Sequence, residues 1–189
     1  VSLPLTIYFT LYAKDAILLL SGESFLASVE PMQIIMPTVF LIALSNLMGW
    51  QILVPMDREK QIVFSTIIGA IVGGIINIFA IPYLGVNGAA IANLCAECAV
   101  VVVQIILLRK FIFPILAKIN IWKMLIALFI STGVTLLIPF NSNEIINLLL
   151  SSILFFGSYL ISLLILKEPM VYQIFSSVLN KIKLKRNAL

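Results

Sequence analysis

The sequence predicts an all-α integral membrane protein, a polytopic helix bundle with six hydrophobic segments. Composition is the first reason: 62% of the 189 residues are hydrophobic and 11% are charged, whereas a soluble domain is about half apolar and about a quarter charged. The second reason is segment length, since most apolar stretches approach the roughly 20 residues with which a helix crosses a bilayer. The third is that Lys and Arg gather in alternate connections.

The six segments are separated by short connections that contain Pro, Gly or charged residues, as expected where helices end. In chain order the segments are residues 1–13, 32–54, 61–81, 89–108, 122–140 and 145–166. The apolar run of residues 2–13 in the first would measure about 18 Å as a helix, too short to cross a bilayer. Because the sequence begins at Val1, we expect a fragment that starts within a transmembrane helix. Residues 16–20 are expected to form an interfacial helical turn. The predicted connections are residues 22–31, 55–60, 82–88, 109–121 and 141–144.

The distribution of cations predicts the topology. Eleven of the 12 Lys and Arg residues lie in the connections after even-numbered segments, at the ends beside them, or in the C-terminal tail, and Lys14 is the exception. The positive-inside rule makes this side, including the C-terminus, cytoplasmic. Tyr83 and Trp122 stand at segment ends, where aromatic belts occur. Because the cations are spread along one face of the membrane, the net charge of +4 indicates membrane lipids and no nucleic acid as partners.

The pattern changes after residue 168. Residues 1–168 form the predicted transmembrane part, and residues 169–189 carry apolar side chains at helical spacing together with several cations. We expect a basic amphipathic cytoplasmic helix that lies on the inner leaflet, held by about 1 kcal/mol per cation near anionic lipid. A membrane anchor is the main interpretation, and a regulatory role is the alternative.

The fourth segment carries Asn93, Glu97 and Gln104, which the helical period places on one face. Glu97 falls near the middle of the span, where a carboxylate is costly and marks a functional site by default. It is the main candidate for the transport path, coupled to H⁺ or Na⁺, and a protonated structural Glu is the alternative. Asn46 and Asn77 are further candidates, although intramembrane amides commonly serve as interhelical hydrogen bonds of about 0.6 kcal/mol.

Small residues recur every fourth position on two neighbouring segments. Gly69 and Gly73 lie on the third segment, and Gly88, Ala89 and Ala92 lie at the start of the fourth. Small side chains let helices approach closely in a membrane. We therefore expect these residues to form a helix-packing interface.

No pattern in the sequence indicates an enzyme. Cys95 and Cys98 form a C-x-x-C inside a membrane span, which lacks both the soluble setting of redox motifs and the further ligands of a metal site. We expect both to be small buried residues. The chain has no His, so imidazole catalysis and His-ligated metals are excluded. We predict no metal and no cofactor apart from a coupling ion.

Three stretches carry a family resemblance. They are PLTIYFTLYAKDAILLLSGESF from Pro4, SNLMGWQILVPMDREK from Ser45 and NIFAIPYLGVNGAAIANLCAE from Asn77. Over residues 3–110 the chain resembles the C-terminal half of bacterial polysaccharide biosynthesis flippases of the Wzx type, in the multidrug/oligosaccharidyl-lipid/polysaccharide exporter superfamily. The most specific motif is Ile-Pro-x-x-Gly-x-x-Gly-Ala-Ala, beginning at Ile81. Beyond residue 110 only the pattern of two further spans agrees.

The resemblance implies a two-lobed transporter in the bacterial cytoplasmic membrane, of which this chain is one lobe. Such a protein would move undecaprenyl-diphosphate-linked oligosaccharide repeat units across the membrane by alternating access, alongside other polysaccharide-assembly membrane proteins. It also implies a cationic cavity, largely in the other lobe. This chain departs from the pattern because it has no intramembrane Arg or Lys, so we do not expect it to transport alone. The alternatives are a cation-coupled multidrug exporter of the same superfamily, an integral membrane glycan polymerase or ligase, and a structural subunit.

Overall fold

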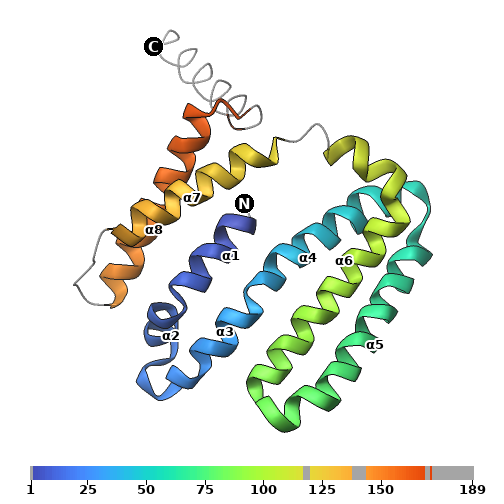
Figure 1. Ribbon diagram of the computed structural model, residues 1–189, viewed down its shortest axis with the longest axis horizontal. Helices are drawn as coiled ribbons and strands as arrows, with labels where there is room; N and C mark the ends of the chain where they lie inside the picture. The colour runs from blue at the N-terminus through green and yellow to red at the C-terminus, as the bar shows by residue number, and fades with distance from the viewer. Residues whose placement is uncertain (1, 117–119, 138–143, 169–170, 172–189) are drawn as a thin grey trace, which may run out of the picture. The chain divides into compact units, whose positions relative to one another are not determined.

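The computed structural model describes residues 2–116, 120–137, 144–168 and 171, and every regular element in these ranges is a helix (Figure 1). The chain divides into two compact units. The first comprises residues 1–117 and 143–148, and the second comprises residues 118–142 and 149–189. Of the predicted tail, residues 169–189, only Val171 is described, so the predicted amphipathic helix lies outside the described residues.

The first unit begins with a broken helix. α1 (Ser2–Leu11) and α2 (Ala13–Ser21) meet at Tyr12 with a bend of 77°. The backbone of Tyr12 (φ −102°, ψ 26°) departs from helical values. The prediction that a single helix ends before Lys14 is therefore wrong: Lys14 and Asp15 lie in the first turn of α2.

The predicted connection at residues 22–31 is largely helical as well. Gly22, with φ +80°, ends α2 in a conformation that only glycine adopts readily. It is followed by the 3₁₀ helix η1 (Glu23–Ser28) and by α3 (Val29–Ile35). α4 (Pro37–Met48) continues the path, with Pro37 in its first turn, where a missing N–H is tolerated.

α4 ends in a change of helix type. A π-helical turn, η2 (Gly49–Leu53), and a 3₁₀ turn, η3 (Val54–Met56), lead to Asp57 in the left-handed region. A cluster of buried apolar side chains forms the core at this end, contributed by α4, η2 and the C-terminal part of α6 (Val86–Leu116). Its members are Met48, Leu53, Val101, Leu108 and Ile112.

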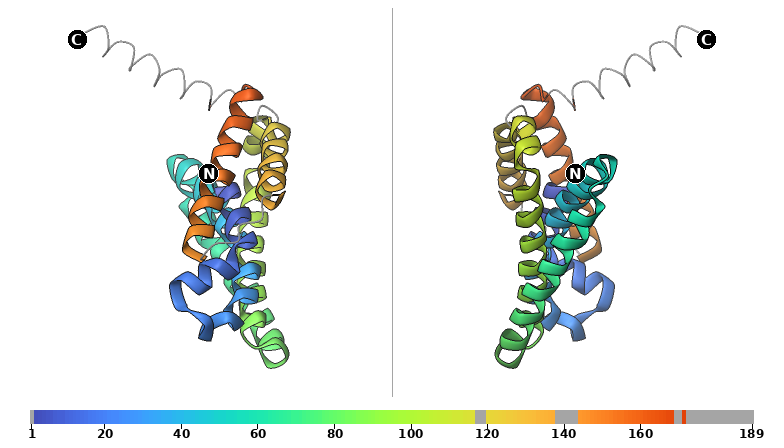
Figure 2. Two further views of the ribbon diagram at one scale, coloured as in Figure 1. Left: turned by 90° about the vertical axis from the view of Figure 1, so that its left-hand side faces the viewer. Right: turned by 90° about the vertical axis from the view of Figure 1, so that its right-hand side faces the viewer.

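α5 (Glu59–Leu84) and α6 form an antiparallel hairpin, and they lie side by side in every view (Figures 1 and 2). Gly85, with φ +54° and ψ −125°, is the single residue between them. The predicted connections at residues 82–88 and 109–121 are therefore too long. Pro82 lies in the last turn of α5, and α6 continues through Arg109 as far as Leu116.

The second unit contains α7 (Ile121–Leu137) and the greater part of α8 (Glu144–Ile165). The Ser131 hydroxyl donates a hydrogen bond to the carbonyl oxygen of Phe155 at 2.6 Å, which joins the two helices. Nζ of Lys123 donates to the carbonyl oxygen of Lys167 at 3.3 Å. The start of α7 and the end of α8 therefore lie together, and each carries a lysine there.

Four helical stretches are long and apolar enough to cross a membrane, and a fifth is added if the bent α1–α2 pair counts as one span. The four are Glu23–Met56, Glu59–Leu84, Val86–Ile112 and Ile145–Ile165. The described part of α7 has 17 residues, about 25 Å of helix, and residues 138–140 of the predicted fifth segment lie outside the described residues. The all-α class and the membrane-type helices are confirmed, and the number of spans is four to five in the described residues, where six were predicted.

Candidate functional site

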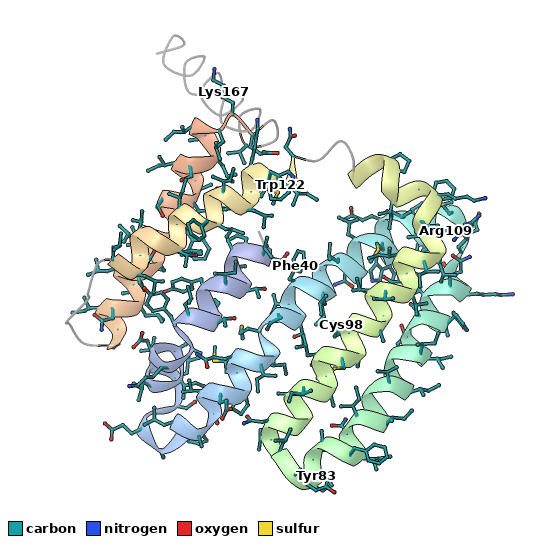
Figure 3. The ribbon with its side chains drawn as sticks, viewed as in Figure 1. Phe40, Tyr83, Cys98, Arg109, Trp122 and Lys167 are labelled. Atoms are coloured by element: carbon teal, nitrogen blue, oxygen red, sulfur yellow. The ribbon has the colours of Figure 1, made fainter. Side chains whose placement is uncertain are left out.

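The candidate site lies along the α5–α6 hairpin, which has two chemically different ends. Figure 3 shows Tyr83 beside the turn at Gly85, Cys98 part of the way along α6, and Arg109 toward the opposite end. Residues 78–96 contain no charged side chain, whereas Arg58, Arg109 and Lys110 lie at the other end. Charge is thus confined to one end of the hairpin and to Glu97 within it.

Glu97 lies close to the middle of the continuous apolar span Val86–Ile112. It is partly buried. It precedes Val101 by four residues, so it shares a face of α6 with this member of the buried cluster. None of the described residues forms a hydrogen bond or ion pair with its carboxyl group. Its carboxyl group therefore stands within the span without a partner among the described residues.

Gln104 occupies a different environment from Glu97, although both lie on α6. It is only 1% exposed, and its Nε2 donates a hydrogen bond to the Ser65 hydroxyl on α5 at 3.2 Å. The Ser65 hydroxyl in turn donates to the carbonyl oxygen of Ile62 at 2.7 Å. Oε1 of Gln104 is buried, and no described residue forms a hydrogen bond with it. This arrangement makes Gln104 an interhelical link between α5 and α6.

None of the three predicted asparagines is hydrogen-bonded to Glu97 within the described residues. Asn93 and Asn46 are exposed, on α6 and α4 respectively. Asn77 is partly buried on α5, and its Oδ1 has no hydrogen-bond partner in the described part of the chain. Within the described residues, no hydrogen bond joins any two of the predicted transport-path residues.

The small residues form the contact between α5 and α6. A Cβ atom on Gly73 would lie 2.9 Å from Cβ of Ala96, and one on Gly69 would overlap the side chain of Val100. Ala92 is fully buried on the same side of α6. The helices therefore approach at a distance that a larger side chain would prevent.

Gly88 makes the closest backbone approach. A Cβ there would lie 2.5 Å from the carbonyl oxygen of Ala80, because the single-residue turn brings the first turn of α6 against the last turns of α5. Ala89, the remaining member of the predicted packing set, is partly buried.

The two cysteines are free thiols on α6. Cys95 is partly buried, but Cys98 is exposed, so the prediction that both are buried is wrong for Cys98. The reason is the helical period. Cys98 follows Ala96 by two residues, which rotates it by about 200° away from the face that packs on α5.

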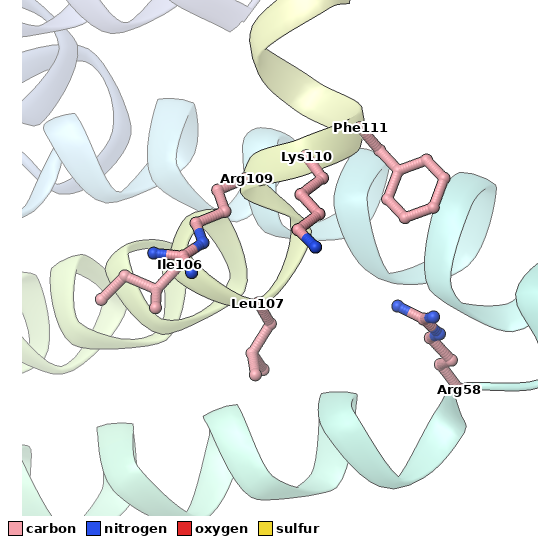
Figure 4. Close-up of a pocket in the computed structure, with 6 residues that line it drawn as sticks. All are labelled: Arg58, Ile106, Leu107, Arg109, Lys110 and Phe111. Carbon is pink, nitrogen blue, oxygen red and sulfur yellow. The ribbon is translucent and has the colours of Figure 1, made fainter.

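A cleft of about 550 Å³ at the cationic end of the hairpin was not foreseen from the sequence. Arg58, Arg109, Lys110, Ile106, Leu107 and Phe111 line it (Figure 4). The Arg58 guanidinium lies over the Phe111 ring, 5.8 Å from its centroid. The signal in the sequence was the two cationic connections predicted on one side of the membrane. Only the antiparallel pairing of α5 and α6 brings them together.

No protein-family model, no curated protein and no solved structure matches the chain.

Proposed function

We propose that this chain is a membrane-embedded part of a transporter that moves lipid-linked oligosaccharide repeat units, carried on undecaprenyl diphosphate, across the bacterial cytoplasmic membrane by alternating access. The observation that carries the proposal is Glu97, whose carboxyl group has no partner among the described residues and lies halfway along a continuous apolar helix. An ionisable group at that depth is retained in transporters where it binds or releases a proton or a cation. The resemblance of residues 3–110 to Wzx-type flippases supplies the substrate class.

Glu97 is proposed to be the ion-coupling group. The energy to export a large polar headgroup must come from a gradient or from the next assembly step, and a carboxylate that alternates between two aqueous sides uses the first source. H⁺ and Na⁺ both fit this group. Asn93, one turn away on the same face, would be its neighbour along the path.

Replacing Glu97 by Gln in the complete transporter tests the role of the carboxylate. Gln has a similar shape but cannot take up or release a proton and binds a cation weakly, so we expect surface glycan to be lost while the amount of protein in the membrane is unchanged. Glu30→Gln is the matched control, because Glu30 is an exposed acid outside the hairpin. Normal surface glycan in the Glu97→Gln strain would contradict the proposal.

A cation-coupled multidrug exporter of the same superfamily is the second candidate, since an intramembrane carboxylate also serves organic-cation exchange. Energised efflux of organic cations with unaltered surface glycan would favour it. A glycan polymerase fits less well, because such an active site needs a sizeable external loop. The α5–α6 connection on the predicted outer side is the single residue Gly85.

A further inference from the structure

The cleft at the cationic end of the hairpin has the composition of a phospholipid site. Three of its six lining residues are cations, Arg58, Arg109 and Lys110, and the other three are Ile106, Leu107 and Phe111. Arg58 comes from the residue before α5, whereas the other five come from α6. A cationic and apolar surface of this kind matches a ligand with a phosphate at one end and hydrocarbon at the other.

The positive charge in the cleft is not neutralised by the described residues. None of the three cations forms an ion pair with an acidic side chain of the described part of the chain. The acidic groups nearest in sequence are Asp57 and Glu59, both exposed beside Arg58. The same end of the hairpin carries four cations, the three of the cleft and Lys60, so its net charge is positive.

The side chains are also arranged for a group that enters between the helices. In Figure 4 the Arg58 side chain extends from the start of α5 toward Phe111 and Lys110, while Arg109 extends along α6 toward Ile106. Arg58 is partly buried and its guanidinium lies over the Phe111 ring, which limits its motion. A guanidinium held in this way binds phosphate oxygens with less loss of side-chain entropy than a free one.

The cleft lies where the apolar span ends, which favours a lipid over a soluble anion. The candidate span on α6 reaches Ile112, one residue beyond the cleft. Ile106 and Phe111 are 59% and 45% exposed, and both would face acyl chains or the glycerol region. Basic pockets between helices at this level bind the headgroups of anionic lipids.

We propose that this cleft binds the phosphate group of an anionic phospholipid in the leaflet that it faces, which the distribution of cations makes the cytoplasmic one. The lipid would bridge the start of α5 and the end of α6, and so would fasten the open end of the hairpin. The site is separate from Glu97 and does not depend on what the protein transports.

Binding of phosphatidylglycerol to the purified transporter in detergent tests the proposal, by native mass spectrometry and by the shift in thermal unfolding. We expect phosphatidylglycerol to bind and to raise the unfolding temperature. Phosphatidylcholine and inorganic phosphate at the same concentrations should do neither. The double substitution Arg109→Gln with Lys110→Gln should weaken phosphatidylglycerol binding roughly tenfold or more, since each nearby cation contributes to attraction of an anionic lipid.

Two control variants separate loss of the site from loss of structure or of charge. Lys14→Gln removes an exposed cation from α2 and should leave binding unchanged. Arg109→Lys with Lys110→Arg keeps both charges and should retain it. Equal binding of phosphatidylglycerol by the double Gln variant, or an equal effect of phosphatidylcholine or inorganic phosphate, would overturn the proposal.

Discussion

Gln104 is a polar residue inside a predicted span, and its side chain forms a hydrogen bond with a neighbouring helix. Its Nε2 donates a hydrogen bond to the Ser65 hydroxyl, and its Oε1 has no partner among the described residues although the side chain is almost fully buried. Glu97, seven residues earlier on α6, has the opposite character, since it is partly buried and unpaired among the described residues. Of the two, Gln104 links α5 to α6, and Glu97 keeps the role in ion coupling only as a proposal.

The Ser65–Gln104 hydrogen bond can be removed by replacing either residue, and we expect the two substitutions to change the free energy of unfolding by different amounts. Ser65→Ala leaves Nε2 of Gln104 without its acceptor, and we expect it to lower the free energy of unfolding by about 0.6 to 1.7 kcal/mol, the range for interhelical hydrogen bonds in membranes. Gln104→Leu keeps the volume and also removes the unpaired Oε1, so we expect a smaller loss or none.

The measurement is the free energy of unfolding of the purified single and double variants in SDS. The change in the double variant should differ from the sum of the two single changes, because the two side chains are in contact. Surface glycan should be retained with Gln104→Leu. Loss of glycan export in a stable Gln104→Leu protein would place Gln104 in the transport path and contradict the packing role.

At the scale of elements, the α5–α6 hairpin shows what spacing in the sequence can and cannot predict. The period of four places Gly69 and Gly73 on one face of α5, and the structure places both against α6. The predicted ends of the two helices are less accurate than the predicted faces. Pro82 suggests an early end, but α5 continues through it to Leu84, without the hydrogen bond that an N–H at this position would donate to the carbonyl group of residue 78. Arg109 and Lys110 suggested a loop, but cations at a membrane surface are equally suited to a continuing helix.

Two adjacent glycines on α5 test the close approach of the helices. A Cβ on Gly73 would lie 2.9 Å from Cβ of Ala96, whereas one on Gly74 meets nothing within 4 Å. We expect Gly73→Ala to force the helices apart and to destabilise the protein by about 1 to 3 kcal/mol. Gly74→Ala should be neutral or stabilising by up to about 1 kcal/mol, because Ala is the better helix former.

Thermal unfolding in detergent provides the measurement, and both variants carry the same chemical change. Equal unfolding temperatures for Gly73→Ala and Gly74→Ala would show that the α5–α6 contact is looser than the structure has it.

At the scale of the whole molecule, composition and segment length predict the all-α class and the membrane-type helices, whereas the predicted six segments are matched by four to five candidate spans in the described residues. The first predicted segment became a helix pair bent at Tyr12, which no Pro or Gly at the bend signals. The cationic cleft could not be predicted from the sequence, although its cations were predicted on one side of the membrane. Residues 58 and 109 are remote in sequence and come together only because α5 pairs with α6. Within each unit, cations gather at one helix end: Arg58 with Arg109 and Lys110 in the first, and Lys123 with Lys167 in the second.

The central claim is that α5 and α6 cross the membrane as a hairpin, with Gly85 outside and the cationic cleft inside. Glu97 has its proposed role only if this is correct. The direct measurement is labelling of single cysteines with a membrane-impermeant maleimide, in the protein expressed in cells with Cys95→Ala, Cys98→Ala and any further cysteine replaced. Val86→Cys lies at the turn, and Lys60→Cys lies at the opposite end, in the first turn of α5. We expect Val86→Cys to be labelled in intact cells and Lys60→Cys only after permeabilisation. Labelling of both positions from the same side would contradict the account.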